Sequence, residues 1–332
     1  MYNFCTYFDS NYISKGIALY LSLEKVCTSF HLYVMAYDKE CYDKLSQIGF
    51  NHMTIELWDD WETEEIKAVK GDRNRAEYCW TCGPTIIYHI LTHYNLPSIT
   101  YLDSDLFFLD NPSLIFNEIG ESSVAITEQG ISPKAEVMYG KYCVQFMFFK
   151  NDTNGLSALK WWRDSCVEWC YMRFEDGKYA DQMYLDQFPV KFEGVYVVKN
   201  PGAGIAPWNM YRYKYSNDGK FIIADRVNYP VVFFHMHGMK GIIKDKTLTL
   251  QSYDAIIDKK IENLFFNGYA ELLATVFTNY MGKAIENVRV KGLGRWRKLE
   301  LLIRSKLNKF EGLRTIYNYF TKRKVYSSGT KI

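Results

Sequence analysis

Short apolar runs alternate with longer amphipathic segments over the first 110 residues. The short runs are rich in apolar and β-prone residues and predict strands at residues 2–7, 31–36, 53–57 and 98–102. Apolar residues at helical spacing predict helices at residues 12–27, 39–48 and 75–94, the last interrupted or restarted at Gly83-Pro84. Strands that alternate with helices through short connections predict an α/β fold with a parallel sheet wrapped on both faces. In such sheets ligands bind at the carboxyl ends of the strands.

The pattern becomes mixed after residue 110. Apolar runs predict strands at residues 122–127, 143–150, 190–198 and 231–235, and a helical pattern covers residues 154–173. Glycine and proline predict a loop at residues 202–208. The residues after about 250 read as helical and increasingly basic, so we expect a boundary there.

Apolar residues follow steps of three or four along the C-terminal region. They are Trp296, Leu299, Ile303, Leu307, Phe310, Leu313, Tyr317 and Phe320. Residues 283–324 hold 13 Lys or Arg against three Glu, a local net charge of +10 in a chain of formal net charge +2. A basic amphipathic helix with a Trp is typical of a helix in an anionic membrane surface, and residues 289–324 would form it. Packing on the body or in a dimer contact is the alternative, and the net acidic body disfavours nucleic acid as a partner.

Composition narrows the class of protein. Of the 332 residues 48% are hydrophobic and 23% charged, which predicts a folded chain with a sizeable core. No apolar run approaches the ~18 residues of a membrane span, and strand-like sequence from Tyr2 onward predicts no signal peptide, so we expect a cytosol-facing protein. The eight cysteines predict reduced packing residues. Cys79 and Cys82 form a CxxC, but Gly-Pro follows the pair rather than separating it, and no second pair suits zinc.

Asp103-Ser104-Asp105 is the sharpest local motif. It follows the predicted strand at residues 98–102 directly, and carboxylates at the end of a strand can hold a hard divalent cation. Mg²⁺ or Mn²⁺ bound there would bridge the phosphates of a nucleotide diphosphate and help it depart. The motif therefore predicts a metal site at Asp103 and Asp105.

His235 and His237 lie on one predicted strand, where alternate residues share a face. With the two carboxylates nearby, we expect His235 to be a metal ligand and His237 less so. A pair of core histidines is the alternative.

Three other positions are candidates for chemistry. Asp181-Gln182 opens a helix-like segment, where Asp181 is either an N-cap or a contact for a donor or acceptor hydroxyl, and a base if the reaction inverts. Arg75 opens a predicted helix and could reach a phosphate or be solvated. Trp208 is a stacking platform or a cover for the core.

These motifs, in this order, resemble the GT-A glycosyltransferases, in particular the nucleotide-diphospho-sugar transferases related to glycosyltransferase family eight. The resemblance covers about residues 2–240. Phe8-Asp9-Ser10-Asn11-Tyr12 is similar to the segment that contacts base and ribose in that family, and Asp103-Ser104-Asp105 to its metal motif. Asp181-Gln182 resembles its Asp-Gln pair near sugar and acceptor, and His235…Gly238…Lys240 its motif of a metal-binding His and a phosphate-binding Lys. Together with the contacts argued from the residues themselves, the expected nucleotide site is formed by Thr6, Tyr7, Asp9, Asn11, Tyr12, Arg75, Asp103, Ser104 and Lys240.

Two departures from the family pattern bear on the site. Only Met239 separates Gly238 from Lys240, where relatives have two residues, which puts the phosphate contact of Lys240 in doubt. Gln145 stands where relatives have a small residue near the donor sugar, which puts the sugar in doubt.

The resemblance implies a GT-A type, Rossmann-like mixed sheet flanked by helices, and the pattern of the C-terminal region adds a basic helical extension. Residues 1–250 would be the catalytic domain, with a nucleotide-binding half (1–110) and an acceptor half (111–250), followed by the helical basic region 251–332. The implied enzyme uses Mn²⁺ or Mg²⁺ to move a hexose from UDP, with retention. The basic amphipathic tail predicts a glycan or lipid-linked acceptor, as in polysaccharide or lipopolysaccharide assembly. We expect it in the cytoplasm, peripheral on the inner face of the membrane.

Other classes explain the sequence less well. Residues 5–16 lack the glycine-rich loop of a sugar nucleotidyltransferase, and neither GxxxxGK[ST] nor GxGxxG occurs. The alternatives that stay open are an inverting transferase of the same fold and a non-catalytic, membrane-associated scaffold or glycan-binding protein.

Overall fold

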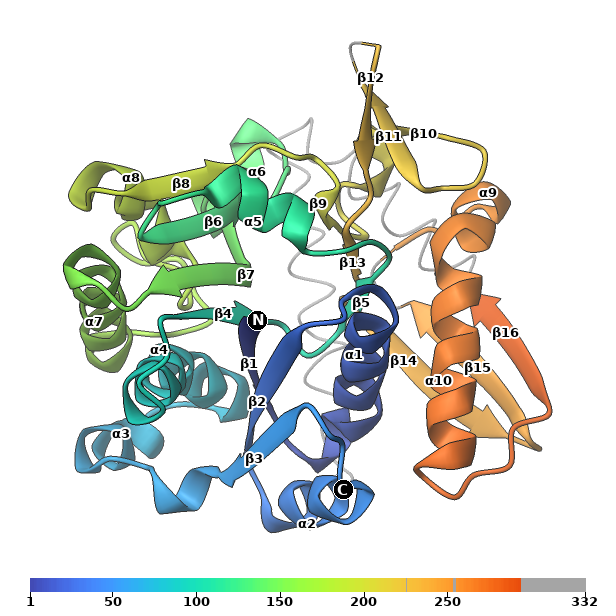
Figure 1. Cartoon of the computed structure of the whole chain (residues 1–332), viewed down its shortest axis with the longest axis horizontal. Helices are drawn as coiled ribbons and strands as arrows, with labels where there is room; N and C mark the ends of the chain where they lie inside the picture. The colour runs from blue at the N-terminus through green and yellow to red at the C-terminus, as the bar shows by residue number, and fades with distance from the viewer. Residues whose placement is uncertain (225, 253–254, 294–332) are drawn as a thin grey trace, which may run out of the picture.

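A seven-stranded mixed sheet forms the centre of the molecule. The computed structural model describes residues 1–224, 226–252 and 255–293. The strands of the sheet are β1 (Tyr2–Phe8), β2 (Phe30–Ala36), β3 (Met53–Leu57), β4 (Ser98–Leu102), β6 (Val124–Glu128), β7 (Tyr142–Lys150) and β8 (Val195–Val198). Their order is β3-β2-β1-β4-β7-β6-β8, with β1 to β4 parallel and β7 antiparallel to β4 and β6 (Figure 1). The predicted α/β class and mixed sheet are confirmed.

Helices cover both faces of this sheet. One face carries α1 (Ile13–Val26), α2 (Lys39–Ile48) and α5 (Ser113–Ile119), and the other α3 (Glu64–Lys70), α4 (Arg75–His93) and α7 (Thr153–Glu168). Side chains of β1 alternate between the two cores, because Phe4 and Phe8 pack with α1 while Cys5 packs with α4. The chain therefore has two apolar layers with the sheet between them (Figure 1).

The strand order reverses between β1 and β4. From β1 the chain proceeds outward through β2 and β3, and α3 and α4 return it to β4 on the other side of β1. Ligands of open α/β sheets bind at such a point, outside the carboxyl ends of the strands. Asp9 follows β1 and Asp103 follows β4, so both lie at this point.

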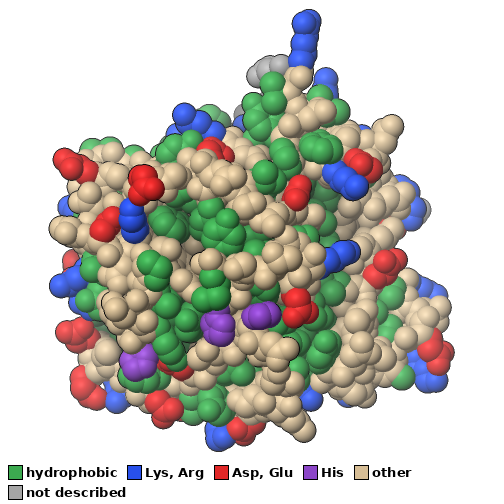
Figure 2. Space-filling model, viewed as in Figure 1, with side chains coloured by type: hydrophobic (Ala, Val, Ile, Leu, Met, Phe, Trp, Pro, Cys, Tyr) green, Lys and Arg blue, Asp and Glu red, His purple; other side chains and the backbone are tan. Residues whose placement is uncertain are grey.

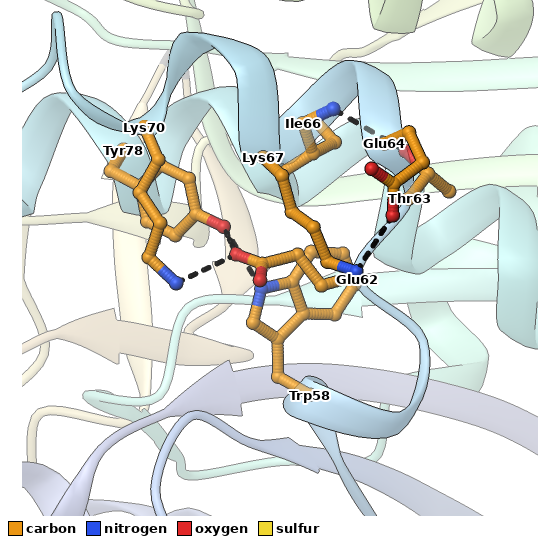
Figure 3. A network of polar contacts seen from close by, with 8 residues as sticks. All are labelled: Trp58, Glu62, Thr63, Glu64, Ile66, Lys67, Lys70 and Tyr78. Atoms are coloured by element: carbon orange, nitrogen blue, oxygen red, sulfur yellow. Dashed lines mark hydrogen bonds and ion pairs between the residues drawn. The ribbon is translucent and has the colours of Figure 1, made fainter.

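A buried carboxylate fixes α3 to α4. Glu62 accepts hydrogen bonds from Tyr78 on α4 and from Lys70 on α3, the latter at 2.8 Å (Figure 3). Trp58 Nε1 donates to the Tyr78 hydroxyl at 3.3 Å. The network fixes the start of the helix that leads into β4.

The helix α4 runs without a break through Gly83 and Pro84, so the predicted interruption is wrong. Proline leaves the carbonyl of Trp80 without its helical partner. Burial of the apolar face of α4 and a capping box of Asn74 and Glu77 outweigh that loss. The glycine is needed for packing, since a Cβ on Gly83 would come within 2.5 Å of the Tyr7 hydroxyl.

Two other predicted boundaries differ from the structure by five residues each. The helix expected to residue 173 ends at Glu168, where Trp169 turns to extended backbone. The strand expected from residue 190 begins at Val195, because Pro189 lies in the first turn of the short helix α8 (Phe188–Lys191). The other short helices and turns are η1 (Ser10–Tyr12), η2 (Trp58–Asp60), α6 (Pro133–Tyr139), η3 (Met183–Gln187) and η4 (Met210–Arg212).

Three small sheets complete the fold. They are β5 (Leu106–Phe108), β13 (Phe233–His235) and β9 (Ala203–Ile205); β10 (Lys214–Tyr215), β11 (Phe221–Ala224) and β12 (Val227–Pro230); and β14 (Met239–Lys244), β15 (Thr247–Ser252) and β16 (Asn287–Lys291). The predicted loop at residues 202–208 thus contains a strand, β9, which pairs with β13. The sheet of β10 to β12 projects from the body at the top of Figure 1.

The described part of residues 251–332 is only partly helical. It contains α9 (Lys259–Ile261), a π-turn η5 (Glu262–Phe266) and α10 (Asn267–Asn279), which packs beside α1 (Figure 1). Asn287–Lys291 (β16) is a strand rather than a helix, because it pairs in parallel with β15. Tyr269 and Leu273 share one apolar core with Phe234, so packing continues across residue 250. The predicted amphipathic stretch 289–324 begins in β16, and its residues from 294 on lie outside the described part.

The surface and the cysteines complete the description. On the face shown in Figure 2, apolar side chains gather near the middle, and acidic and basic side chains are mixed around them. All eight cysteines are free thiols, as predicted. Among the described residues, no helix combines the length and the apolar character that a membrane-spanning helix requires.

Candidate active site

Strand pairing brings Asp103, Asp105 and His235 together. Asp103 and Asp105 occupy the turn between β4 and β5, and β13 pairs with β5 so that His235 lies opposite Leu106. The Met236 amide donates to the Asp105 carbonyl at 2.9 Å. One ligand atom from each of the three residues lies within 4.8 Å of the other two. The structure thus places the three predicted metal ligands at one point.

Gln145 on β7 orients His235. Gln145 Oε1 lies 2.9 Å from His235 Nδ1, and the Gln145 amide nitrogen donates to Thr127 Oγ1 at 3.3 Å. An amide oxygen can only accept, so Nδ1 carries the proton and Nε2 faces the two carboxylates. Gly204 leaves room for this amide, since a Cβ there would come 2.7 Å from Gln145 Nε2.

The donor set fits a divalent cation. Two carboxylates and one imidazole are ligands that such hard or borderline cations accept in proteins. A ligating histidine usually donates its second nitrogen to an acceptor, as His235 does to Gln145. The residues present can therefore hold the cation that the resemblance implies.

The carboxylates differ in electrostatic environment. Burial raises the pKa of Asp103, whose Oδ1 accepts a hydrogen bond from Tyr101 at 2.7 Å. Burial alone would also raise the pKa of Asp105, but Lys15 and His235 outweigh it and hold that pKa well below its usual range. Burial would lower the pKa of His235, but Asp105 at 3.0 Å raises it well above its usual value.

Lys15 is a member of the site that the sequence analysis missed. Its Nζ lies 3.1 Å from Asp105 Oδ2, and its side chain is only 15% exposed. The residue lies in the first turn of α1, which follows β1 after the short helix η1, and this position near the carboxyl end of a strand was the signal available in the sequence. Gln145 was noticed for its size but not for its contact with His235.

The expected nucleoside contacts gather at the end of β1. Asp9 pairs with Arg75, and Asp9 Oδ1 accepts from the Asn11 amide at 2.9 Å. Tyr12 is 43% exposed beside them. The Arg75 guanidinium is thus engaged with Asp9.

Three of the expected nucleotide contacts have little exposed surface. Thr6 and Ser104 are buried and Tyr7 is half-buried. Thr6 is fully buried on β1, and its Oγ1 has no hydrogen-bond partner among the described residues. The ring of Tyr7 stacks on Tyr101 at 5.1 Å. Ser104 is 9% exposed between the two metal-site carboxylates.

Asp181 and Gln182 precede η3, and the Asp181 carboxyl is close enough to Asp103 and to Tyr7 of β1 for their charges to interact. Asp181 is 5% exposed, and burial followed by the charge of Asp103 raises its pKa to about 8. It is not the N-cap of η3, because Gln182 occupies that position. The Gln182 amide nitrogen donates to the Tyr139 carbonyl at 2.9 Å.

The part of the site around His235 also includes Trp208, His237 and Lys240. Lys240 is exposed on β14, in register with Gln251. His237 is exposed as well. The Trp208 ring stands edge-on to both imidazoles at 5.4 Å, and its Nε1 donates to the Gln129 carbonyl at 2.8 Å. Trp208 therefore covers the histidine ligand.

The fold is that of the GT-A glycosyltransferases. The galactosyltransferase LgtC, solved with donor and acceptor sugar analogues, aligns with 85% of this chain and 99% of its own at a TM-score of 0.50 and 14% identity. An active-site mutant of LgtC aligns with 82% of this chain and 95% of its own, at a TM-score of 0.50 and 13% identity. The predicted GT-A architecture is confirmed.

Two curated proteins are similar to this chain in sequence. The chain belongs to the family of the uncharacterized protein YfnD of Bacillus subtilis (strain 168), with 30% identity over 275 residues, 81% of this chain and 87% of YfnD. YfnF of the same organism is 29% identical over 248 residues, 71% of this chain and 81% of YfnF. No protein-family model matches the chain.

Proposed function

We propose that this protein is a metal-dependent glycosyltransferase that moves a sugar from a nucleotide diphosphate to an acceptor. The observation that carries the proposal is the convergence of Asp103, Asp105 and His235, with ligand atoms within 4.8 Å of one another, at the carboxyl end of β4 in a GT-A fold. Such an arrangement suits a cation that binds a diphosphate.

The residues of this chain have separate roles in the proposal. Asp103, Asp105 and His235 hold Mn²⁺ or Mg²⁺, which neutralises charge on the departing diphosphate when bound. Asp9, Asn11 and Tyr12 hold the nucleoside at the end of β1, beside the metal site at the end of β4. We assign UDP as the nucleotide and a hexose as the sugar, on the resemblance to family eight.

Asp181 and Gln182 face the sugar and the acceptor. With a pKa raised to about 8, the Asp181 carboxyl is mostly protonated at pH 7 and would donate a hydrogen bond to a hydroxyl. We assign retention of configuration on the resemblance to family eight, and inversion with Asp181 as general base is the alternative.

The acceptor in our proposal is a glycan or a lipid-linked glycan of polysaccharide or lipopolysaccharide assembly. The support is the basic charge of residues 283–324 with its interleaved apolar positions, which suits attachment to an anionic membrane from the cytoplasmic side. LgtC was solved with donor and acceptor sugar analogues, which is consistent with a sugar acceptor.

Calorimetric titration of UDP, GDP and dTDP, each with and without Mn²⁺, tests the proposal. We expect one nucleotide to bind tightly only with metal, and Asp103→Asn or Asp105→Asn to abolish both that binding and turnover. Asp60→Asn changes an exposed aspartate on η2 and should behave as wild type. If no nucleotide binds, or both site variants keep wild-type turnover, the metal-dependent transferase is wrong, and metal-independent glycan binding would indicate a binding protein.

A further inference from the structure

Lys15 lies between the expected nucleoside contacts and the metal ligands. Its Nζ is 3.1 Å from Asp105 Oδ2 on one side and 4.5 Å from the centroid of the Tyr12 ring on the other. In a bound nucleotide diphosphate, the two phosphates would extend from the nucleoside toward the metal site. A group between Tyr12 and Asp105 therefore lies where the diphosphate must pass.

We propose that Lys15 is the cationic residue that binds the donor diphosphate. This inference rests on the proposed function and names a residue to which neither the resemblance nor the relatives assign a role. The resemblance points to Lys240 instead, and the spacing between Gly238 and Lys240 departs from the family there.

The environment of Lys15 suits a phosphate contact. The side chain is 15% exposed, so its ammonium is held in place while it keeps access to solvent. It lies in the first turn of α1, where the helix dipole favours an anion. An ammonium has three donor hydrogens, so contact with Asp105 leaves donors for phosphate oxygens.

A purely structural role for Lys15 is the competing explanation. In that case the ammonium would only balance the buried Asp105, whose other oxygen faces His235 at 3.0 Å. The two explanations differ in their effect on ligands. A structural counter-ion should matter equally for a nucleoside and its diphosphate, whereas a diphosphate contact should matter only for the diphosphate.

The test compares the 332-residue wild-type chain with Lys15→Met, Lys15→Arg and Lys25→Met. Lys25 is exposed at the far end of the same helix, so Lys25→Met matches the chemical change away from the site. Calorimetry measures binding of UDP and of uridine in Mn²⁺, and of Mn²⁺ alone. If another nucleotide binds wild type better, that nucleotide and its nucleoside replace UDP and uridine.

We expect Lys15→Met to weaken UDP binding about 10-fold to 100-fold, the range for loss of a hydrogen bond to a charged group. Uridine binding should stay within twofold, and Mn²⁺ alone should bind as tightly as to wild type or more tightly, because a positive charge beside the site is removed. Lys15→Arg should retain most of the affinity for UDP, and Lys25→Met should equal wild type.

Two results would overturn the inference while leaving the proposed function intact. One is wild-type UDP affinity in Lys15→Met, and the other is an equal loss of UDP and uridine. Loss of Mn²⁺ binding in Lys15→Met would also contradict it, because the lysine would then support the metal site itself. A wild type that binds no nucleotide diphosphate overturns the proposed function and the inference with it.

Discussion

At the scale of single residues, Gln145 has the most specific task in the site. Its side chain fixes which nitrogen of His235 faces the carboxylates, while its backbone carbonyl accepts from the Asp103 amide at 3.0 Å. A substitution removes only the side-chain contact. We therefore predict that Gln145→Leu weakens Mn²⁺ binding by about 10-fold to 100-fold, the usual effect of losing a partner of a metal-binding histidine.

Calorimetric titration with Mn²⁺ measures this effect, and thermal unfolding shows that the variant is folded. Gln47→Leu, on the exposed face of α2, is the matched control and should bind Mn²⁺ as wild type does. If Gln145→Leu binds Mn²⁺ with unchanged affinity, the assigned role in orienting His235 is wrong.

Asp181 makes a pH-dependent contribution to stability. Its pKa rises from 3.8 to about 8 on folding because of burial and the nearby Asp103. Between these values the folded protein holds a proton that the unfolded chain has released. The contribution of Asp181 to the free energy of unfolding is therefore highest below about pH 4 and falls as the pH rises to about 8. The slope is about 1 kcal/mol per pH unit.

We predict that Asp181→Asn removes this slope. Unfolding of wild type and variant at pH 5 and pH 8 measures it, and the variant should gain stability over wild type at the higher pH. Asp60→Asn should show no such gain. A difference between Asp181→Asn and wild type that is the same at both pH values would contradict the prediction.

At the scale of elements, the sequence predicted the parallel half of the sheet almost residue by residue. The ranges predicted for α2, β3 and β4 are those observed, since each has a clear period and a polar or glycine boundary. Errors occurred where a long-range partner decides the structure. The short strand β9 forms because it pairs with β13, and β16 forms because it pairs with β15. Both partners are distant in sequence, so the local pattern does not predict either pairing.

The site follows the same division. Asp103, Asp105 and His235 were predicted because a local motif or strand carries each of them. Lys15 and Gln145 each act on a residue 90 positions away, and only the sheet order brings them there. The local pattern could place Lys15 near the carboxyl end of β1, but it does not name the distant partner of either residue, so the sequence alone could not assign their roles.

At the scale of the whole molecule, the folded core of the described residues extends to Leu293, before most of the basic tail. Leu293 is buried and its amide donates to the Ala255 carbonyl at 3.1 Å, and β16 before it completes a sheet with β15. A chain cut after Lys283 would lose that strand. A chain that ends at Leu293 keeps it and removes only residues 294–332.

We predict that the chain ending at Leu293 binds nucleotide and Mn²⁺ as wild type does but no longer binds anionic vesicles. The reason is that residues 295–324 carry most of the basic charge of the tail and its apolar stripe, and the remaining body is net acidic. Co-sedimentation with vesicles of anionic and of neutral lipid measures binding, and wild-type binding should weaken as salt rises. Equal binding of both chains to anionic vesicles would place membrane attachment elsewhere. Equal failure of both would favour packing or dimer contact as the role of the tail.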